Sequence, residues 1–305
     1  MLSRVARRIY WLARYIERAE NTARLVNTYN FLLLDLPRGT RVSWGVLPVI
    51  TGGFGIFNEH YQRHDERNTV KFLLADTFNP ASLVNSVSSA RENCRTSREE
   101  LPGQAWELIN ELHLYVHGHL DEALPRRGRF TFLTDVIQRC QQLTGFLAGT
   151  MSEDHAYDFV RIGRNLERAD MTTRVIDIGA TSLADADQPG SIDMHVWTSM
   201  LRAMNAYQMY RKSVQIGVQY ADVVGFLLQN NYFPRSVAHC LDQVEECLGN
   251  LPQHKDTLKP VREARRHVDR IKPDKLDARS LHTTVDRLQV NISAIHEEIR
   301  KTWFE

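Results

Sequence analysis

Apolar residues recur along the chain at the spacing of amphipathic helices. Near the N-terminus they follow one another in steps of three and four, which places them on one stripe of a helix. These positions are Val5, Ile9, Leu12, Ile16, Ala19, Ala23 and Val26. Ser3 is suited to cap the helix at its start, and Pro37 and Gly39 are expected to end it. The pattern predicts a first helix of about 30 residues.

Further helices are expected in the first half of the chain, separated by proline and glycine. We expect Asn79 to be the N-cap and Pro80 the first residue of a helix that extends to about Ser97. Another helix is expected to begin at Pro102 and to reach about Ala123. Strong strand signals are almost absent, so the hydrophobic pattern indicates an all-α protein.

Glycines weaken two parts of this pattern. Gly128 is expected to break the chain before the last helix of the first half, which covers residues 131–151. Between residues 43 and 61 several glycines make any helix uncertain. The Val46–Ile50 stretch in that region is short and carries Pro48, which argues against a central strand.

A charged sequence motif, or phrase, occurs twice, 150 positions apart, beginning at Arg14 and again at Arg164. Arg, Glu, Arg, Ala, Thr and Arg recur at matched places, and Glu20 is replaced only by Asp170. Later landmarks recur in the same order, namely Trp44 with Trp197, Phe72 with Phe226, Pro80 with Pro234, Ser82 with Ser236, and Leu101 with Leu251. This predicts a duplicated helical bundle with repeats 1–152 and 153–305, packed as one compact domain.

Helical geometry places the charges of the first phrase. Glu17, Glu20 and Arg24 share one stripe, and Arg14 and Arg18 lie together on another side. Glu20 borders the apolar stripe and should be at least half buried. In the second phrase the same geometry puts Glu167, Asp170 and Arg174 on one side, with Arg164 and Arg168 on the other.

Two interpretations of this repeated motif stay open. Buried carboxylates and guanidinium groups must be paired, so the motifs can form a structural seam around a pseudo-twofold axis. Alternatively, the arginines hold a phosphate or carboxylate ligand, and the acids act as a base or as orienting groups. The residues alone identify no catalytic group.

Composition narrows the class of protein. Among the 305 residues, Lys plus Arg number 38 and Asp plus Glu number 37, so the net charge of +1 gives no field for non-specific nucleic-acid binding. The four cysteines are isolated, which is typical of reduced thiols in a cytoplasmic protein. No apolar run approaches the roughly 20 residues that span a membrane. The arginine-rich N-terminus is interpreted as the first helix, not as a targeting segment.

Histidines raise the question of a metal site. His60 with His64, and His113 with His117, have the i,i+4 spacing that can chelate a metal on a helix. Neither pair recurs in the second half, and the Glu-x-x-His pattern of helical di-metal sites is missing. We therefore expect neither a metal nor a cofactor.

Other conspicuous residues have simpler explanations. Trp44 and Trp197 are expected to be core anchors. The glycine-rich residues 52–55 lack the Gly-Lys-Ser/Thr of a phosphate loop and are better explained by a tight helix crossing or a flexible loop. The basic stretch Arg262–Arg270 is interrupted by acids and is interpreted as a solvated helix face. No Ser-His-Asp or Cys-His arrangement is apparent.

The residues from Ala13 to Arg24 closely resemble the opening of the bacterial Alpha-E family, a predicted helical domain with a Glu-Arg motif. The resemblance covers nearly the whole chain and includes Trp44, the Phe78-Asn79-Pro80-x-Ser82 turn and the second Glu167-Arg168-Ala169-Asp170. The Glu-Arg motif then corresponds to Glu17-Arg18 and to Glu167-Arg168.

The resemblance implies a non-catalytic helical accessory protein. Members of the family are similar to proteins encoded or fused beside a circularly permuted ATP-grasp amide ligase, often with a transglutaminase-like protein. The association with these enzymes implies a role in forming or remodelling peptide or amide bonds. The alternative is an enzyme or an anionic-ligand-binding protein that uses the paired Glu and Arg residues. Neither a partner's identity nor the oligomeric state follows from the sequence.

Overall fold

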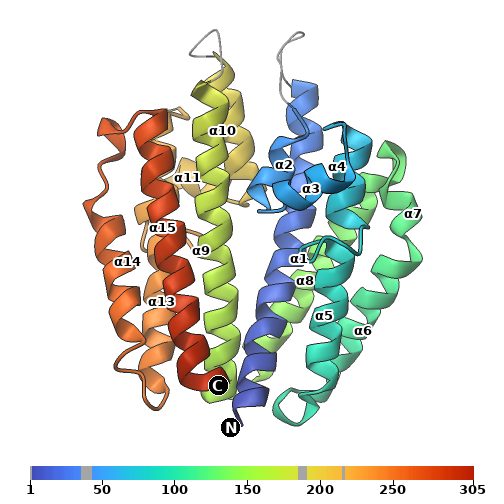
Figure 1. Ribbon diagram of the computed structural model, residues 1–305, viewed down its shortest axis with the longest axis vertical. Coiled ribbons are helices and arrows are strands. Elements are labelled where there is room, and N and C mark those ends of the chain that lie inside the picture. Colours follow the sequence, from blue (N-terminus) through green and yellow to red (C-terminus); the bar gives the residue numbers. More distant parts are fainter. Residues whose placement is uncertain (1, 36–42, 185–190, 215–216) are drawn as a thin grey trace. The chain divides into compact units, whose positions relative to one another are not determined.

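The computed structural model describes residues 2–35, 43–184, 191–214 and 217–305, and every regular element in these ranges is a helix (Figure 1). The predicted all-α class is confirmed for this part of the chain. None of these helices is both long enough and apolar enough to cross a membrane. The chain divides into two compact units, which are described in turn.

The first unit comprises Met1–Asn27, Ser43–Arg164 and Phe304. Its helices are α1 (Ser3–Asp35, whose last turns belong to the second unit), α2 (Val46–Ile50), α3 (Phe54–His60), α4 (Glu66–Leu74), α5 (Leu83–Arg95), α6 (Gly103–Gly118), α7 (Leu120–Ala123) and α8 (Arg126–Thr150). Helix α5 packs on α6, and α6 packs on α8. Val87, Ile109 and Val136 from these three helices are fully buried. Burying each such side chain contributes about 1.5–3 kcal/mol.

The second unit comprises Thr28–Val42, Asn165–Trp303 and Glu305. Its helices are α9 (His155–Ala184, whose first turns belong to the first unit), α10 (Ser191–Ala203), α11 (Tyr207–Ser213), α12 (Tyr220–Gln229), α13 (Val237–Asn250), α14 (Leu258–Arg270) and α15 (Ala278–Ile299). Helix α14 packs against both α13 and α15, and Val244, Val261 and Leu288 of these three helices are buried (Figure 1). The three helices form the bundle to which the basic 262–270 stretch belongs.

The predicted repeats 1–152 and 153–305 divide the chain differently from these compact units. The first turns of α9 belong to the first unit, and the last turns of α1 belong to the second. A sequence repeat reflects common ancestry, whereas these compact units are defined by contacts within the folded chain. The two repeats and their packing as one domain therefore stay a prediction.

The N-cap predicted at Asn79 is wrong. The buried Asn79 side chain donates from Nδ2 to the Phe72 carbonyl oxygen at 2.9 Å, and its Oδ1 accepts from the Ala81 backbone at 3.0 Å. Helix α5 begins instead at Leu83, and Ser82 caps it by accepting from the Asn85 backbone nitrogen at 3.3 Å. Asn79 closes the turn after α4, so the capping role passes to the next polar side chain along the chain.

The break predicted at Gly128 is also wrong, because α8 runs from Arg126 through that glycine. A Cβ atom on Gly128 would lie 2.5 Å from the Glu122 backbone oxygen. The glycine therefore permits close approach between the first turn of α8 and the preceding segment. The helix expected from Pro102 to Ala123 is divided, with α6 ending at Gly118 and α7 following.

The uncertain stretch between residues 43 and 61 forms two short helices, α2 and α3. Gly52 between them has a φ of 71°, a conformation that glycine adopts without a steric penalty. A Cβ atom on Gly53 would lie 2.9 Å from the Phe72 ring, so the absence of a side chain at Gly53 permits close approach to that ring. The first helix covers Ser3–Asp35 as expected, whereas Pro37 and Gly39 lie outside the described residues.

Candidate functional site

The first charged motif lies on α1, and its acids are buried as the apolar stripe predicts. Glu17 and Glu20 each expose only 1% of their surface. Arg24 donates from Nε to Glu20 Oε1 at 2.8 Å, four residues along the helix. Gln141 of α8 donates to the same oxygen at 3.5 Å. Glu20 is therefore held from its own helix and from a neighbouring one.

The arginines on the other side of α1 lie against aromatic rings. Arg14 is buried, donates to the Tyr10 hydroxyl at 3.0 Å and has its guanidinium carbon 5.2 Å from the centre of the Trp11 ring. Arg18 is half-buried, and its guanidinium carbon lies 5.6 Å from the centre of the Tyr15 ring. Such cation–π contacts favour a fixed guanidinium orientation.

Cys140 of α8 lies close enough to the first charged motif for the carboxylates of the motif to change the pKa of its thiol. Burial raises the pKa of the Cys140 thiol well above its usual value, and the carboxylates of Glu20 and Glu17 raise the pKa further. The thiol is therefore neutral at physiological pH, which makes it a packing group and not a nucleophile. All four cysteines are free and buried.

A small hollow lies beside Glu17 in the first unit, with a volume of about 20 Å³. Its apolar lining consists mainly of Leu12, Ile16, Leu143, Leu147 and Val160. Arg164, the first residue of the second motif, lines the same hollow as Glu17. A volume of this size accommodates about one water molecule. It has no room for an organic substrate.

The remainder of the second motif belongs to the second unit and repeats the local pattern of the first. Glu167 is buried at 3% exposure and Arg168 is half-buried, as Glu17 and Arg18 are. Arg174 donates from Nε to Asp170 Oδ2 at 2.8 Å. This pair is more exposed than the corresponding Glu20–Arg24 pair, at 21% for the Asp170 side chain. The prediction that the two charged ridges face each other stays a prediction.

The histidine pairs singled out from the sequence do not form a group with a third metal ligand among the described residues. His60 Nδ1 lies 2.9 Å from the Ile56 carbonyl oxygen, and the ring stacks on Phe78 with centroids 3.8 Å apart. The His113 and His117 rings lie 4.0 Å apart, and burial lowers the pKa of His113 to about 4. Trp44 and Trp197 are buried, which agrees with their prediction as core anchors.

The one cluster of potential metal ligands among the described residues was missed from the sequence, and it consists of Asp177, His282 and Asp286. His282 Nδ1 lies 2.6 Å from Asp177 Oδ1, and Nε2 lies 3.5 Å from Asp286 Oδ2. The hydrogen bond to Asp177 raises the pKa of His282 above its usual value. An imidazolium that bridges two carboxylates explains this geometry without a metal. Only the spacing from His282 to Asp286 was visible in the sequence.

The sequence matches, over residues 1–304, a family described as "a predicted alpha-helical domain with a conserved ER motif". The chain belongs to the Alpha-E family. The resemblance stated from residues 13–24 is therefore confirmed over almost the whole chain.

The Alpha-E chain is similar to uncharacterised mycobacterial proteins. One from Mycobacterium bovis and one from Mycobacterium tuberculosis are each 24% identical to it over 319 residues, and another from Mycobacterium tuberculosis is 23% identical. Each match covers 97% of this chain but 36% of the relative, so the chain spans about a third of the length of these proteins. No solved structure matches it.

Proposed function

We propose that this Alpha-E protein is a non-catalytic accessory partner of a circularly permuted ATP-grasp amide ligase, working with a transglutaminase-like protein. The proposal rests on the family's resemblance to proteins that are encoded or fused beside such a ligase. The mycobacterial relatives support it, because in each of them the matched segment is about a third of a longer chain. A domain that occurs within longer proteins fits a role alongside other functional parts.

The burial of the two acids of α1 supports the non-catalytic part of the proposal. Glu17 and Glu20 are almost fully buried, and the hollow beside Glu17 within the first unit holds about 20 Å³. A general base must come within hydrogen-bond reach of a substrate proton. Side chains that are enclosed in this way serve better as structural groups than as catalysts.

A direct experiment is co-expression of a tagged copy of this chain with the circularly permuted ATP-grasp ligase of the same organism. We expect the two to co-purify, and we expect added Alpha-E protein to increase amide formation by the ligase. Failure to co-purify, together with unchanged turnover of the ligase, would count decisively against the proposal.

The alternative function, catalysis or anion binding by the Glu and Arg residues of the motifs, is tested by Glu17→Gln. This change keeps the shape of the side chain and removes its charge. If the motif is structural, a folded Glu17→Gln protein should support the ligase as well as the wild type does. Loss of that support without loss of folding would favour the alternative.

We also propose that the chain arose by duplication of one helical unit. The starts of α4 and α12 and those of α5 and α13 are each separated by 154 residues, and those of α3 and α11 by 153. Ser82 and Ser236 cap α5 and α13 in the same way. An experimental structure in which α1–α8 and α9–α15 could not be superposed in order would contradict this origin.

A further inference from the structure

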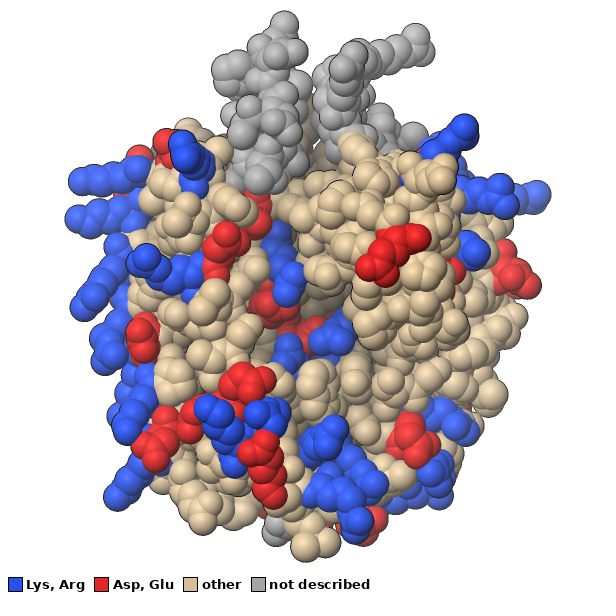
Figure 2. All heavy atoms as spheres, in the orientation of Figure 1, with Lys and Arg blue, Asp and Glu red and all other residues tan. Residues whose placement is uncertain are grey.

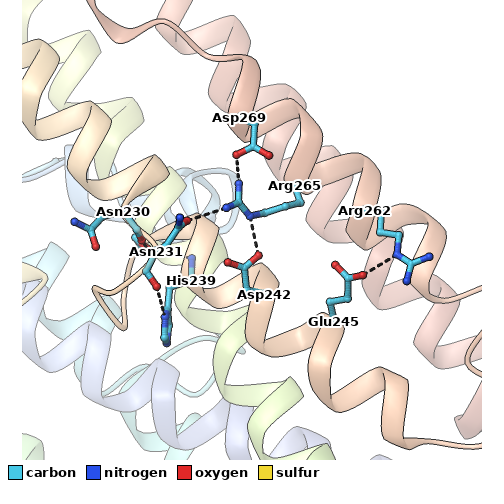
Figure 3. Close-up of polar contacts among 9 residues, drawn as sticks. Asn230, Asn231, His239, Asp242, Glu245, Arg262, Arg265 and Asp269 are labelled. Atoms are coloured by element: carbon cyan, nitrogen blue, oxygen red, sulfur yellow. Dashed lines mark hydrogen bonds and ion pairs between the residues drawn. The ribbon is translucent and has the colours of Figure 1, made fainter.

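Helix α14 carries its arginines on two faces, and the face toward α13 is fully paired. Arg262 donates from Nε to Glu245 Oε1 at 2.7 Å. Arg265 donates to Asp242 Oδ1 at 2.7 Å and to Asn231 Oδ1 at 2.8 Å, and it also pairs with Asp269 (Figure 3). On this face each guanidinium group therefore has a carboxylate partner.

The face toward α15 is different. A groove of about 570 Å³ lies between α14 and α15, and its lining residues are Glu263, Arg266, His267, Arg270, Arg287 and Asn291. Arg266, Arg270 and Arg287 are exposed, and none of them forms an ion pair with an acid in the described part of the chain. Figure 2 shows basic side chains gathered along the edge of the second unit where α14 lies. The sequence-based interpretation of 262–270 as a solvated helix face agrees with the exposure of Arg262, Arg266 and Arg270. The structure adds that one side of this face is paired with acids and the other lines a groove.

The pKa of His267 responds to the charged side chains that line this groove. Burial lowers the pKa of His267, the guanidinium of Arg287 lowers it further, and Glu263 only partly opposes these effects. The His267 ring is oriented by Asn291, whose Nδ2 lies 3.5 Å from Nδ1. Three guanidinium groups around one hollow repel each other, and one acid at the same groove does not neutralise them.

We propose that this groove binds a small ligand that carries a diphosphate group. Guanidinium forks match the geometry of phosphate oxygens and bind them through paired hydrogen bonds. A phosphoryl group carries up to two negative charges where a carboxylate carries one, so one diphosphate balances the three arginines within a compact space. The volume lies in the range of small-molecule sites, about 300–1,000 Å³.

The test is isothermal titration calorimetry of the full chain with sodium pyrophosphate, at an ionic strength held constant with sodium chloride. Arg266→Ala, Arg270→Ala and Arg287→Ala should each weaken binding by about tenfold or more. Arg262→Ala is the matched control: it removes the same charge from the same helix, but from the paired face, and should change the Kd by less than about twofold. Circular dichroism confirms that each variant is folded.

A parallel titration with ADP distinguishes the source of the diphosphate. Binding of both ligands with the same arginine dependence supports the proposal, and tighter binding of ADP would assign the nucleoside part to the groove as well. The proposal is overturned if neither ligand binds, or if Arg262→Ala weakens binding as much as Arg287→Ala does.

His267 gives a second readout that folding changes alone would not produce. An anion held between the arginines favours the charged imidazolium, so saturating pyrophosphate should raise the pKa of His267, followed by NMR through its ring protons. The same pKa shift should occur in Arg262→Ala and be lost in Arg287→Ala. Binding that leaves the pKa of His267 unchanged would place the ligand elsewhere.

Discussion

Glu17 and Glu167 are carboxylates with 1% and 3% of their surface exposed, and each lies next to a half-buried arginine in the chain. Removing a buried, paired carboxylate leaves its partners without compensation, at a cost of about 3–5 kcal/mol. We therefore expect Glu17→Ala and Glu167→Ala each to lower the free energy of unfolding by about that amount, measured by urea denaturation. Asp170→Ala, at the more exposed pair, should cost less than about 1 kcal/mol. Wild-type stability in both glutamate variants would contradict a structural role for the motif.

Glu66 of α4 provides a comparison between a buried and an exposed arginine on one carboxylate. Arg129 is 2% exposed; it pairs with Glu66 at 2.8 Å and donates to the carbonyl oxygens of Ala123 and Leu124 at 3.1 and 2.6 Å. Arg126 pairs with the same carboxylate, but its side chain is 71% exposed. Arg129→Met should cost about 3–5 kcal/mol because it removes the buried partner of Glu66 and the donor to the Ala123 and Leu124 carbonyl oxygens, whereas Arg126→Ala should cost less than about 1 kcal/mol. Equal shifts in their urea midpoints would refute this ranking.

The His282 bridge predicts a dependence of stability on pH. Its pKa is raised first by the hydrogen bond to Asp177, and the charge of Asp286 adds to the effect. A raised folded-state pKa gives stabilisation that is complete below the unfolded value of about 6.5 and is lost as the pH rises through the folded pKa. Burial also raises the pKa of Asp177, which Arg174 and His282 oppose. We expect the wild type to lose more stability than His282→Gln between about pH 6 and pH 8. The effect should be small because His282 is nearly half exposed, and parallel pH profiles would rule it out.

Residues on one helix were predictable, and contacts between distant helices were not. The burial of Glu20 follows from its place beside the apolar stripe of α1, because helical geometry fixes which residues share a face. The contact between Asp177 and His282 joins residues 105 positions apart, and no local pattern encodes it. The groove on α14 was missed for the same reason: Arg287 comes from a different helix from Arg266 and Arg270.

At the scale of helices, Gly163 marks where α9 approaches α1 within the first unit. A Cβ atom there would lie 2.3 Å from the Tyr10 backbone oxygen, which cannot rotate away as a side chain can. Gly163→Ala should therefore destabilise the protein by about 1–3 kcal/mol. Gly145→Ala in α8 is the matched change, since nothing lies within 4 Å of the position its methyl group would occupy and the helix gains about 0.5–1 kcal/mol. Thermal melts of the two variants should shift in opposite directions, and a gain of stability in Gly163→Ala would refute the close approach.

Helix existence followed from hydrophobic periodicity, but helix ends depended on contacts made by single polar or small residues. Asn79 has the chemistry of an N-cap, yet its amide is engaged with Phe72, and Ser82 caps α5 instead. Gly128 has the signature of a break, yet it lies inside α8 at a close contact with Glu122. In both cases the residue type was consistent with two roles, and tertiary contacts selected between them.

At the scale of the whole molecule, α1 and α9 each supply turns to both compact units. Helix α1 runs from Ser3 to Asp35, and its part in the first unit ends at Asn27. Helix α9 runs from His155 to Ala184, and its part in the first unit ends at Arg164. Helix formation is cooperative, so unfolding of either unit disrupts a helix that the other needs. The chain should therefore unfold in one transition despite its two units.

Pulsed hydrogen exchange in urea, resolved by peptide mass spectrometry, measures this directly. Peptides from α6 and α8 report the first unit, and peptides from α13 and α14 report the second. We expect both sets to lose protection at the same urea concentration, because neither bundle retains its long helix once the other has melted. Two separate midpoints would mean that the shared helices break near Asn27 and Arg164 at little cost, and that each unit is stable by itself.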